Sequence, residues 1–507
     1  MKRILLAAAI FSILNFQFPI SHAQNDGETY EQWKKRMQND FAGYKRQQKE
    51  EYENFRQKAN ADYAAFLKKN WDQLHAQPAV EQPDPKPVPP VVAPKEETLR
   101  PRKDKMQPVK ALVTLDAPKP QPAPVEPVEL NLPLDEATQI ALTTSFFGST
   151  VECRVDSMPQ FDLPDLGGDA LADAWDQLSD GQCDVLLAQC LDLRRRLHLG
   201  DWGYIELLDS ISQVAAPKDA DKATFLMAWL YCQSGYMMRL AVSYGRLYML
   251  YASDNVIYEV NYITIGGYKF YPYKGEMLEK IKVCPASFPN EQTMTLRLAS
   301  EPVLEAAKTA KDGRRMQADR YPEMDVTATV NPNLIDFYNN YPTGSLDADF
   351  GSRWTIYANT PLSDNVRETL YPQLERFLTG KTKLQAVEML LNWVQTSLVY
   401  EYDDTVWGGD RAFFAEETLH YPYADCEDRS ILFSLLVRDL VGLRVVLLYY
   451  PGHLATAVRF EDEQPSGDYL QLNDGRYYIA DPTYIGATVG MSMPSVKDET
   501  IKVIILD

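Results

Sequence analysis

The stretch from Asp425 to Thr483 limits most strongly what this chain can fold into. An apolar helical run over 426–441 begins after Asp425 and stops at Gly442. Two apolar strands follow, over 444–450 and 454–460, and a third over 477–480 ends at a proline. A helix that leads into alternating strands separated by short turns predicts a helix packed on an antiparallel sheet. The expected fold class is therefore α+β.

Three residues with nucleophilic or acid–base chemistry lie where these elements end. Cys426 begins the helix, His453 follows the Pro451-Gly452 turn, and Asp481 closes the third strand. A thiol at a helix N-terminus meets the positive end of the helix dipole and free backbone N–H groups. An imidazole can take the thiol proton, and a carboxylate can orient the imidazole. The pattern predicts a Cys426–His453–Asp481 catalytic triad.

The motifs around these three residues resemble those of the transglutaminase-like superfamily. They are Asp425-Cys426-Glu427-Asp428, Gly452-His453 and Asp481-Pro482-Thr483, and they are most similar to those of the bacterial transglutaminase-like cysteine proteinases. The resemblance covers 357–507, which is the expected catalytic domain. It implies a papain-like arrangement of the triad and a thioester acyl-enzyme. It also suggests Trp407 as an oxyanion donor, although a core aromatic is the alternative role for that residue.

The reaction itself stays open between three alternatives. Water can resolve the thioester, which gives a peptidase or amidase acting on a peptide or protein substrate, and this is the favoured interpretation. An amine can resolve it instead, which gives a crosslinking acyl transferase. In the third alternative the triad is a relic within a scaffold or binding protein. Asp425, Glu427 and Asp428 surround the thiol with negative charge and argue against high reactivity, unless they point away; Asp425 is expected to cap the helix.

The N-terminus predicts export. Lys2-Arg3 precedes an apolar run, and Ser21-His22-Ala23 forms a small-x-small cleavage site, so residues 1–23 read as a signal peptide. The cysteine that a lipoprotein anchor would need does not follow this site, and no later apolar run reaches the ~20 residues that span a membrane. The mature chain is expected to be periplasmic or secreted.

Residues 24–77 form a predicted helical arm with aromatic pairs repeated every 11 residues. The pairs are Tyr30/Trp33, Phe41/Tyr44, Tyr52/Phe55 and Tyr63/Phe66. An 11-residue period winds an apolar stripe slightly right-handed around a helix, and such a stripe needs a partner. Pairing with a second copy of the chain is the favoured interpretation, and packing on the same chain or binding a surface ligand are the alternatives. Residues 78–133 are Pro-rich and are expected to form an extended spacer that separates the arm from the catalytic part.

The middle of the chain, 134–300, is expected to be an α+β domain and has features of a degenerate copy of the catalytic one. Placing Asp221 over Asp428 brings Gly235 onto Gly442 and Gly245 onto Gly452. In this alignment the catalytic positions hold Asp219, Arg246 and Tyr273, so the copy would be non-catalytic. An unrelated α+β domain is the alternative. Residues 301–356 are expected to form a β-rich connection.

Charge and cysteine content narrow the partners. A formal net charge of −20 argues against nucleic acid and anionic lipid as partners. Six cysteines in an exported chain suggest disulfides, but leaving Cys426 unpaired leaves five, so at least one more thiol would be free. Cys183 and Cys190, at helical spacing, are as well explained by burial as by bonding. Paired Cys or His spacings typical of metal sites are missing, so neither a metal nor a cofactor is expected.

Overall fold

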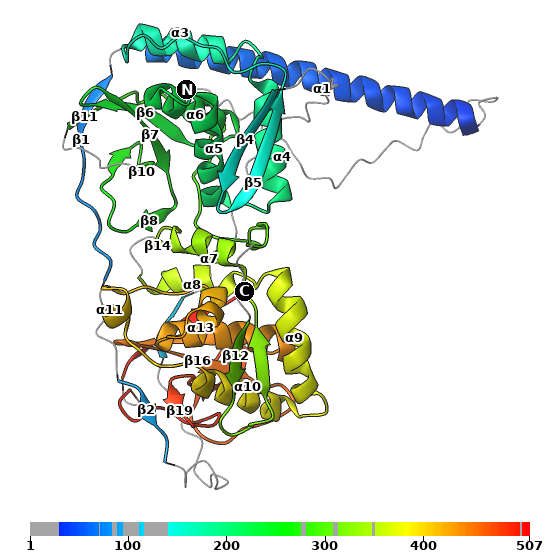
Figure 1. The fold of residues 1–507 in the computed structure, drawn as a ribbon, viewed down its shortest axis with the longest axis vertical. Coiled ribbons are helices and arrows are strands. Elements are labelled where there is room, and N and C mark those ends of the chain that lie inside the picture. The colour runs from blue at the N-terminus through cyan, green and yellow to red at the C-terminus, as the bar shows by residue number, and fades with distance from the viewer. Residues whose placement is uncertain are drawn as a thin grey trace. The chain divides into compact units, whose positions relative to one another are not determined.

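The computed structural model describes residues 30–69, 71–83, 89–94, 111–115, 140–274, 280–307, 313–346, 350–496 and 499–507. The predicted signal peptide lies outside these residues. The chain divides into a first unit that ends at Lys58 and a compact unit from Ala59 to Asp507. The compact unit mixes helices with largely antiparallel sheets, which confirms the α+β class (Figure 1). Within the described part of the chain, no helix is long and apolar enough to cross a membrane.

Helix α1 (Tyr30–Leu67) carries the aromatic repeat. In the first unit, Tyr44 is 55% exposed and Phe55 is 43% exposed. In the compact unit, Tyr63 is buried with its ring centroid 4.4 Å from that of Trp175. The Trp175 indole N–H also donates a hydrogen bond to the buried side chain of Asn60 at 3.0 Å. The last turns of α1 therefore contribute to the core of the compact unit.

The C-terminal sheet positions two of the three predicted catalytic residues. Its order is β17-β18-β16-β15-β20-β3, and all neighbours are antiparallel except β20 and β3. The strands are β3 (Ala111–Leu115), β15 (Val445–Tyr450), β16 (His453–Arg459), β17 (Tyr469–Leu472), β18 (Gly475–Ala480) and β20 (Ile501–Ile505). Alternate residues of these strands face two different apolar cores. This burial on both faces explains why the strands read as continuous apolar runs rather than alternating ones.

Helices cover one face of this sheet. The central helix is α13 (Cys426–Leu436), which packs on β16, continues as a π-helical turn (Val437–Val441), and ends at Gly442 with φ of +69°. Glycine takes this left-handed conformation without steric cost, so it ends the helix as the sequence predicts. Helices α8 (Arg353–Asn359), α10 (Lys383–Ser397) and α12 (Ala415–His420) pack against α13. The other helices of this part of the chain are α9 (Asp364–Leu378), which contacts α10, and α11 (Asp403–Val406).

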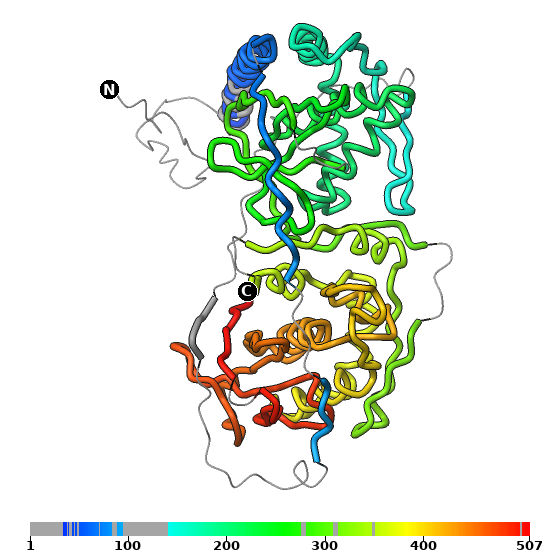
Figure 2. Tube along the Cα trace, turned by 90° about the vertical axis from the view of Figure 1, so that its left-hand side faces the viewer, coloured from blue at the N-terminus to red at the C-terminus, as the bar shows by residue number. Residues whose placement is uncertain are grey.

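The segment between α1 and β4 does not behave as a free spacer where the structure describes it. Strand β1 (Asp72–His75) pairs with β11, β2 (Val91–Val92) pairs with β19 (Tyr484–Ile485), and β3 adds to the C-terminal sheet. Figure 2 shows residues 71–83 as an extended segment along the compact unit. The Gln82 amide donates to the backbone and side-chain oxygens of Asp410, both at 2.7 Å. The predicted spacer over 78–133 and the arm boundary at 77 are therefore corrected, because backbone pairing anchors this segment.

The middle region contains a second six-stranded sheet, in the order β1-β11-β6-β7-β10-β9. Its other strands are β6 (Met238–Ser243), β7 (Arg246–Ala252), β9 (Ile263–Ile265), β10 (Tyr268–Pro272) and β11 (Lys280–Val283). Helix α6 (Ala220–Gln233) packs on β7. Beside it lie the hairpin β4 (Ile140–Phe146) and β5 (Ser149–Val155) and the helices α3 (Gly168–Leu178), α4 (Asp184–Arg196) and α5 (Asp201–Ala215).

The two sheets have the same strand order relative to the helix that precedes them. Five strands of each sheet occupy equivalent positions. In the middle sheet they are β11, β6, β7, β10 and β9, and in the C-terminal sheet they are, in the same order, β20, β15, β16, β18 and β17. The hairpin β6–β7 pairs Ser243 with Arg246, just as β15–β16 pairs Tyr450 with His453. This pairing agrees with the alignment predicted from the sequence, in which Arg246 holds the position in the middle sheet that His453 holds in the C-terminal sheet.

One residue of that alignment is wrong. Tyr271 pairs with Tyr251 on β7, and Tyr478 pairs with Val458 on β16, so Tyr271 and Tyr478 are equivalent. Asp481 then corresponds to Lys274, not to Tyr273. The sequence alignment slipped by one residue because the loop between the strands carries no residue that fixes its length. The C-terminal Asp481 carboxylate is thus matched in the middle region by an amine.

The region 301–356 is mixed rather than β-rich. It contains the hairpin β12 (Arg314–Gln317) and β13 (Asp325–Ala328), helix α7 (Pro332–Asn339), strand β14 (Gly344–Leu346), a 3-10 turn (Phe350–Ser352) and the start of α8. Strand β14 pairs with β8 (Asn255–Ile257) of the middle region.

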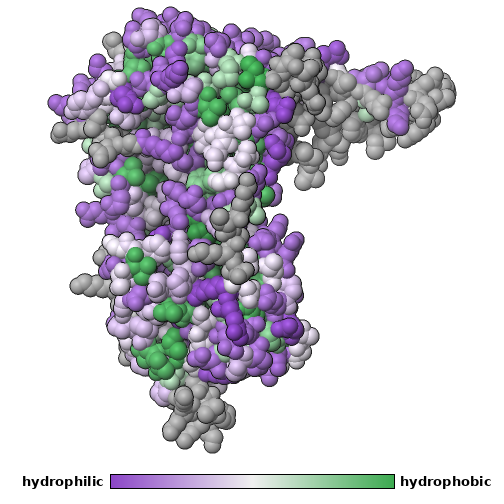
Figure 3. Space-filling view, viewed as in Figure 1, coloured by the Kyte–Doolittle hydropathy of each residue, from purple (hydrophilic) through white to green (hydrophobic). Residues whose placement is uncertain are grey.

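Figure 3 shows a mainly hydrophilic surface on the face it draws, with hydrophobic residues in small groups. Within 301–356, large apolar side chains such as Leu334 and Phe337 are buried.

Candidate functional site

Cys426 is the first residue of α13 and is 3% exposed. Asp425 caps the helix, as predicted: its side chain accepts a hydrogen bond from the Glu427 backbone N–H at 3.2 Å. Asp428 completes the cap by accepting from the Asp425 backbone N–H at 3.3 Å. These reciprocal bonds satisfy backbone donors that a helix start leaves open. They also fix the thiol at the positive end of the helix.

His453 and Asp481 form a buried pair. Both are 2% exposed, and His453 Nε2 lies 2.9 Å from Asp481 Oδ2. His453 starts β16 directly after the Pro451-Gly452 turn, and Asp481 directly follows β18, so the adjacent strands β16 and β18 bring them together. The second Asp481 oxygen accepts from the Thr483 backbone N–H at 2.9 Å. The structure thus brings together His453 and Asp481 in the relation that the sequence predicts.

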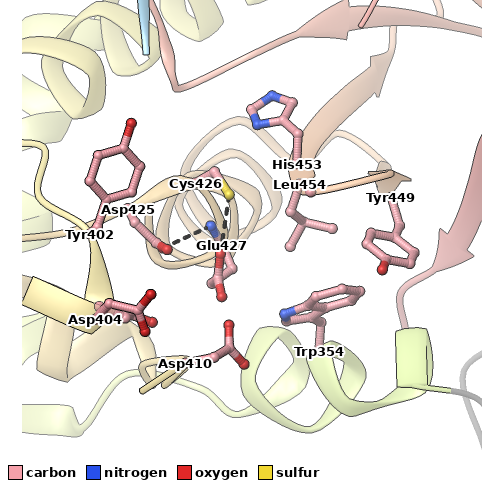
Figure 4. A pocket seen from close by; sticks show the side chains of 12 residues that line it. Trp354, Tyr402, Asp404, Asp410, Asp425, Cys426, Glu427, Tyr449, His453 and Leu454 are labelled. Atoms are coloured by element: carbon pink, nitrogen blue, oxygen red, sulfur yellow. Dashed lines mark hydrogen bonds between the residues drawn. The ribbon is translucent and has the colours of Figure 1, made fainter. Parts of the chain in front are cut away.

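His453 and Cys426 both line one small pocket. The pocket is formed by Trp354, Tyr402, Asp403, Asp404, Asp410, Asp425, Cys426, Glu427, Tyr449, Gly452, His453 and Leu454. Figure 4 shows Cys426 and His453 among the side chains that line this pocket. Among the described residues, His453 Nδ1 has no hydrogen-bond partner. The cavity volume of about 30 Å³ is room for about one water molecule.

The thiol is held by a carboxylate rather than by the imidazole. Cys426 Sγ donates a hydrogen bond to Glu427 Oε2 at 3.1 Å. Burial raises the pKa of the Cys426 thiol well above its ordinary value, and the negative charges of Glu427 and Asp425 raise this pKa further. The helix dipole acts in the opposite direction. Burial and the nearby carboxylates therefore favour the neutral thiol over the thiolate.

A buried arginine compensates part of this negative charge. Arg353 is 0% exposed, forms an ion pair with Asp410, and lies 3.4 Å from Glu427. Near it, Asp403 accepts a hydrogen bond from the Arg411 backbone N–H at 2.7 Å. Burial and the charge of Glu427 raise the pKa of Asp403 to about 8. Sequence reasoning missed Arg353, Asp403 and Asp410, because they come from segments far from Cys426 in the chain.

Buried carboxyl groups give this region an unusual pH dependence. Burial raises the pKa of Glu416 and of Glu417 to about 7, in addition to that of Asp403. Unfolded carboxyl groups titrate near 4, so between about pH 4 and pH 8 the folded chain holds protons that the unfolded chain has lost. Stability must then fall as pH rises through that window.

We therefore expect the midpoint of urea-induced unfolding to be higher at pH 5.5 than at pH 8. Carboxyl groups with ordinary or lowered pKa values are already ionised at pH 5.5 and do not oppose this trend. The triple variant Asp403→Asn, Glu416→Gln, Glu417→Gln should show a smaller difference between the two pH values. A midpoint that rises with pH in the unmodified chain would contradict the expectation.

Trp407, the suggested oxyanion donor, is not among the residues that line the pocket. It is partly exposed and packs edge-on against Phe413 and Tyr421, with the Arg411 guanidinium 4.5 Å from its ring. The alternative role as a packing aromatic therefore fits this residue. Trp354 lines the pocket instead, is 2% exposed, and has an indole N–H without a hydrogen-bond partner among the described residues. No motif near Trp354 in the sequence indicates this position.

The site thus offers a buried thiol, an imidazole oriented by a carboxylate, and, among the described residues, an indole N–H and an imidazole nitrogen without hydrogen-bond partners. Such a set can perform nucleophilic acyl chemistry once the thiol proton is moved to the imidazole. All six cysteines lie among the described residues and none forms a disulfide, so Cys426 keeps its thiol.

By fold and site, the chain is an α+β protein with a buried cysteine, histidine and aspartate at the meeting point of a helix and an antiparallel sheet. No protein-family model matches the chain. No curated protein sequence matches it with significance either.

Proposed function

We propose that this protein is an exported thiol hydrolase of the transglutaminase-like type, which cleaves amide bonds in a peptide or protein. The observation that carries the proposal is the His453–Asp481 pair at 2.9 Å, in a histidine that lines the same pocket as Cys426 and whose Nδ1 has no hydrogen-bond partner among the described residues. A carboxylate on one imidazole nitrogen fixes the tautomer in which the other nitrogen accepts a proton.

In the proposed reaction, Cys426 Sγ attacks the amide carbonyl carbon while its proton passes to His453 Nδ1. The tetrahedral oxyanion is stabilised by the Cys426 backbone N–H at the start of α13 and by the Trp354 indole N–H. His453 then protonates the leaving amine, and the C–N bond breaks to leave a thioester. Water attacks the thioester with His453 as base, which releases the acid and restores the thiol. Because burial and the carboxylates favour the neutral thiol, proton transfer to His453 accompanies the attack in this proposal.

The test is the rate of iodoacetamide alkylation at Cys426 as a function of pH, followed by mass spectrometry on the mature chain. We expect the rate to rise mainly above the ordinary thiol pKa of about 8.5, since the carboxylates raise the thiol pKa. The His453→Ala variant should react more slowly at pH values below the thiol pKa, because it lacks the proton acceptor that the neutral thiol needs. Equal rates in the two proteins would overturn the proposal.

Acyl transfer to an amine is the closest alternative and uses the same intermediate. Once a substrate is known, adding a primary amine distinguishes the two, because a transferase forms the amide product and a hydrolase releases the acid.

A scaffold with a relic triad is the second candidate, and one observation favours it. The Cys426 thiol bonds to Glu427, and the cavity beside it holds about one water molecule. The middle region gives this candidate a precedent within the chain. There the helix and sheet order is the same, but Asp219, Arg246 and Lys274 occupy the three positions. On this basis we interpret the middle region as a degenerate repeat that has kept its fold without the chemistry.

We also propose that α1 mediates self-association. Tyr44 and Phe55, from successive 11-residue repeats, are more than two-fifths exposed. A single polar helix gains little stability alone, so an exposed aromatic stripe favours pairing with the same stripe of a second copy. The variant Tyr44→Ser, Phe55→Ser should shift the molar mass in sedimentation equilibrium toward that of one chain. An unchanged mass would contradict this role.

A further inference from the structure

The pocket beside Cys426 is too small for the reaction that we propose for this site. Its volume of about 30 Å³ holds about one water molecule, and Cys426 itself is 3% exposed. Sites that bind small ligands usually measure ~300 Å³ or more, so one wall of the pocket has to move before a peptide amide can reach the thiol. This step rests on the proposed function, since a relic triad would not need to open.

Three of the walls belong to the packed layers of the fold. Cys426 begins α13, whose residues are all buried. His453 begins β16, which lies between β15 and β18 in the C-terminal sheet. Trp354 comes from α8, which packs on α13, and is 2% exposed. Moving any of these walls would disrupt the core.

The fourth wall is the segment 402–410, which contains α11. The residues that it contributes to the pocket are Tyr402, Asp403, Asp404 and Asp410. The backbone N–H groups of 405–408 donate to carbonyl oxygens of the same segment, and the Arg411 N–H donates to the Asp403 carboxylate at 2.7 Å. These bonds tie the segment into one loop. Trp407 packs on aromatic rings that do not line the pocket.

Contacts with α13 do not hold this loop closed. Carboxylate oxygens of Asp403, Asp425 and Asp428 lie within 4.8 Å of one another, and those of Asp403, Asp410 and Glu427 lie equally close. Carboxyl groups at this separation repel one another unless they share protons. The closed position of the loop therefore depends on tethers from other segments.

Two tethers meet on Asp410. Arg353, which is fully buried, forms an ion pair with the Asp410 carboxylate. The Gln82 side-chain amide donates to the same carboxylate and to the Asp410 carbonyl oxygen, both at 2.7 Å. Gln82 belongs to the extended segment 71–83, which passes beside α11 (Figure 1). Because this segment lies outside the helices and the sheet that form the other walls, Gln82 is the tether that can be released without disturbing the core.

The segment 71–83 is itself fixed to the middle region. The Gln82 backbone N–H donates to the Glu259 carboxylate at 2.7 Å. The Ala79 backbone N–H donates to the Asn261 side chain at 2.8 Å. The position of the loop beside Cys426 is thus coupled to the middle region through one short stretch of chain.

We propose that the segment 402–410 is a lid over Cys426 and that Gln82 latches this lid in its closed position. Opening breaks the hydrogen bonds and the ion pair that meet on Asp410, and it separates the acidic groups of the lid from those of α13. The middle region then controls access to the thiol through the segment 71–83, although it lacks the three catalytic residues itself.

The test is the rate of iodoacetamide alkylation at Cys426 in Gln82→Leu, measured by mass spectrometry on the full mature chain at fixed pH. We expect this rate to rise about tenfold, because two hydrogen bonds that hold the lid closed are lost. Gln77→Leu is the matched control: Gln77 lies in the same segment, but its side chain donates to Thr264 at 3.3 Å, so the rate should not change. Cys232, a buried thiol on α6, should react no faster in either variant, which separates lid opening from unfolding.

Gln82→Glu gives a second measurement with the opposite electrostatic sign. Glutamate keeps the size of the side chain, but it cannot donate to Asp410 and it repels that carboxylate. Its extra negative charge by itself raises the thiol pKa and slows alkylation, whereas release of the lid makes alkylation faster. We expect the faster reaction.

Unchanged or slower alkylation in either Gln82 variant would overturn the lid, as would an equal rise in Gln77→Leu. If Gln82→Leu exposes Cys232 as well, the Gln82→Glu result decides. The proposed hydrolysis is tested separately by the dependence on His453. Faster alkylation in Gln82→Leu, together with equal rates in His453→Ala and the unmodified chain, would support the lid and reject the hydrolase.

Discussion

Replacing Arg353 with methionine is expected to lower the free energy of unfolding by about 3–5 kcal/mol, the range found when one partner of a buried ion pair is removed. The guanidinium is fully buried, pairs with Asp410 and Glu427, and lies 4.1 Å from the centre of the Phe350 ring. Methionine fills a similar apolar volume but leaves both carboxylates without a counter-charge. The shift should be visible in urea-induced unfolding followed by tryptophan fluorescence.

Arg315→Met is the matched control for this experiment. Arg315 also pairs with a carboxylate, Asp325, but its side chain is 74% exposed, so water replaces the lost partner. The control should leave the urea midpoint unchanged. Adding Asp410→Leu and Glu427→Leu to the Arg353 variant should recover much of the loss, because the unpaired charges are then gone. Equal midpoints for the Arg353 and Arg315 variants would show that the buried pair does not stabilise the fold.

Replacing Glu427 with glutamine is expected to raise the alkylation rate of Cys426 near neutral pH by about tenfold. Glu427 accepts the thiol hydrogen bond and is the nearest negative charge that raises the thiol pKa. Glutamine keeps the shape but removes the charge, and a fall of about one pKa unit raises the thiolate fraction about tenfold. The rate is measured by mass spectrometry at fixed pH.

Glu368→Gln, an exposed carboxylate on α9, is the control and should leave the rate unchanged. A slower reaction in Glu427→Gln would contradict the expected effect and would indicate that Glu427 accepts the thiol proton. An unchanged rate would mean that solvent screens the carboxylate despite its burial.

Local signals predicted the elements that hold the site. Asp425 caps α13, Gly442 ends it, Pro451-Gly452 forms the hairpin turn, and Asp481 follows a strand, all as the sequence indicates. These features depend on residues a few positions apart, which is why they can be read from one sequence. The cap also explains why Asp425, one of the acidic residues beside the thiol, is present: its side chain bonds to the start of α13.

Contacts between distant segments could not be predicted in this way. Arg353 and Asp410 reach Glu427 from α8 and from the loop after α11, and no spacing rule connects them. The same limit explains why the sequence suggested Trp407 and gave no signal for Trp354. Proline content correctly indicated extended backbone after α1, but it carries no information on which strand that backbone pairs with.

The edge strand β3 has a consequence for how the chain acquires its structure. It pairs with β20, so the C-terminal sheet joins segments from the first quarter and the very end of the sequence. Closing such a long loop is entropically costly, and folds dominated by distant pairings form slowly. During synthesis β1, β2 and β3 emerge long before their partners β11, β19 and β20. Their unpaired backbone groups are then open to wrong partners, so assistance from a chaperone should raise the yield of native protein more than it raises the stability of the product.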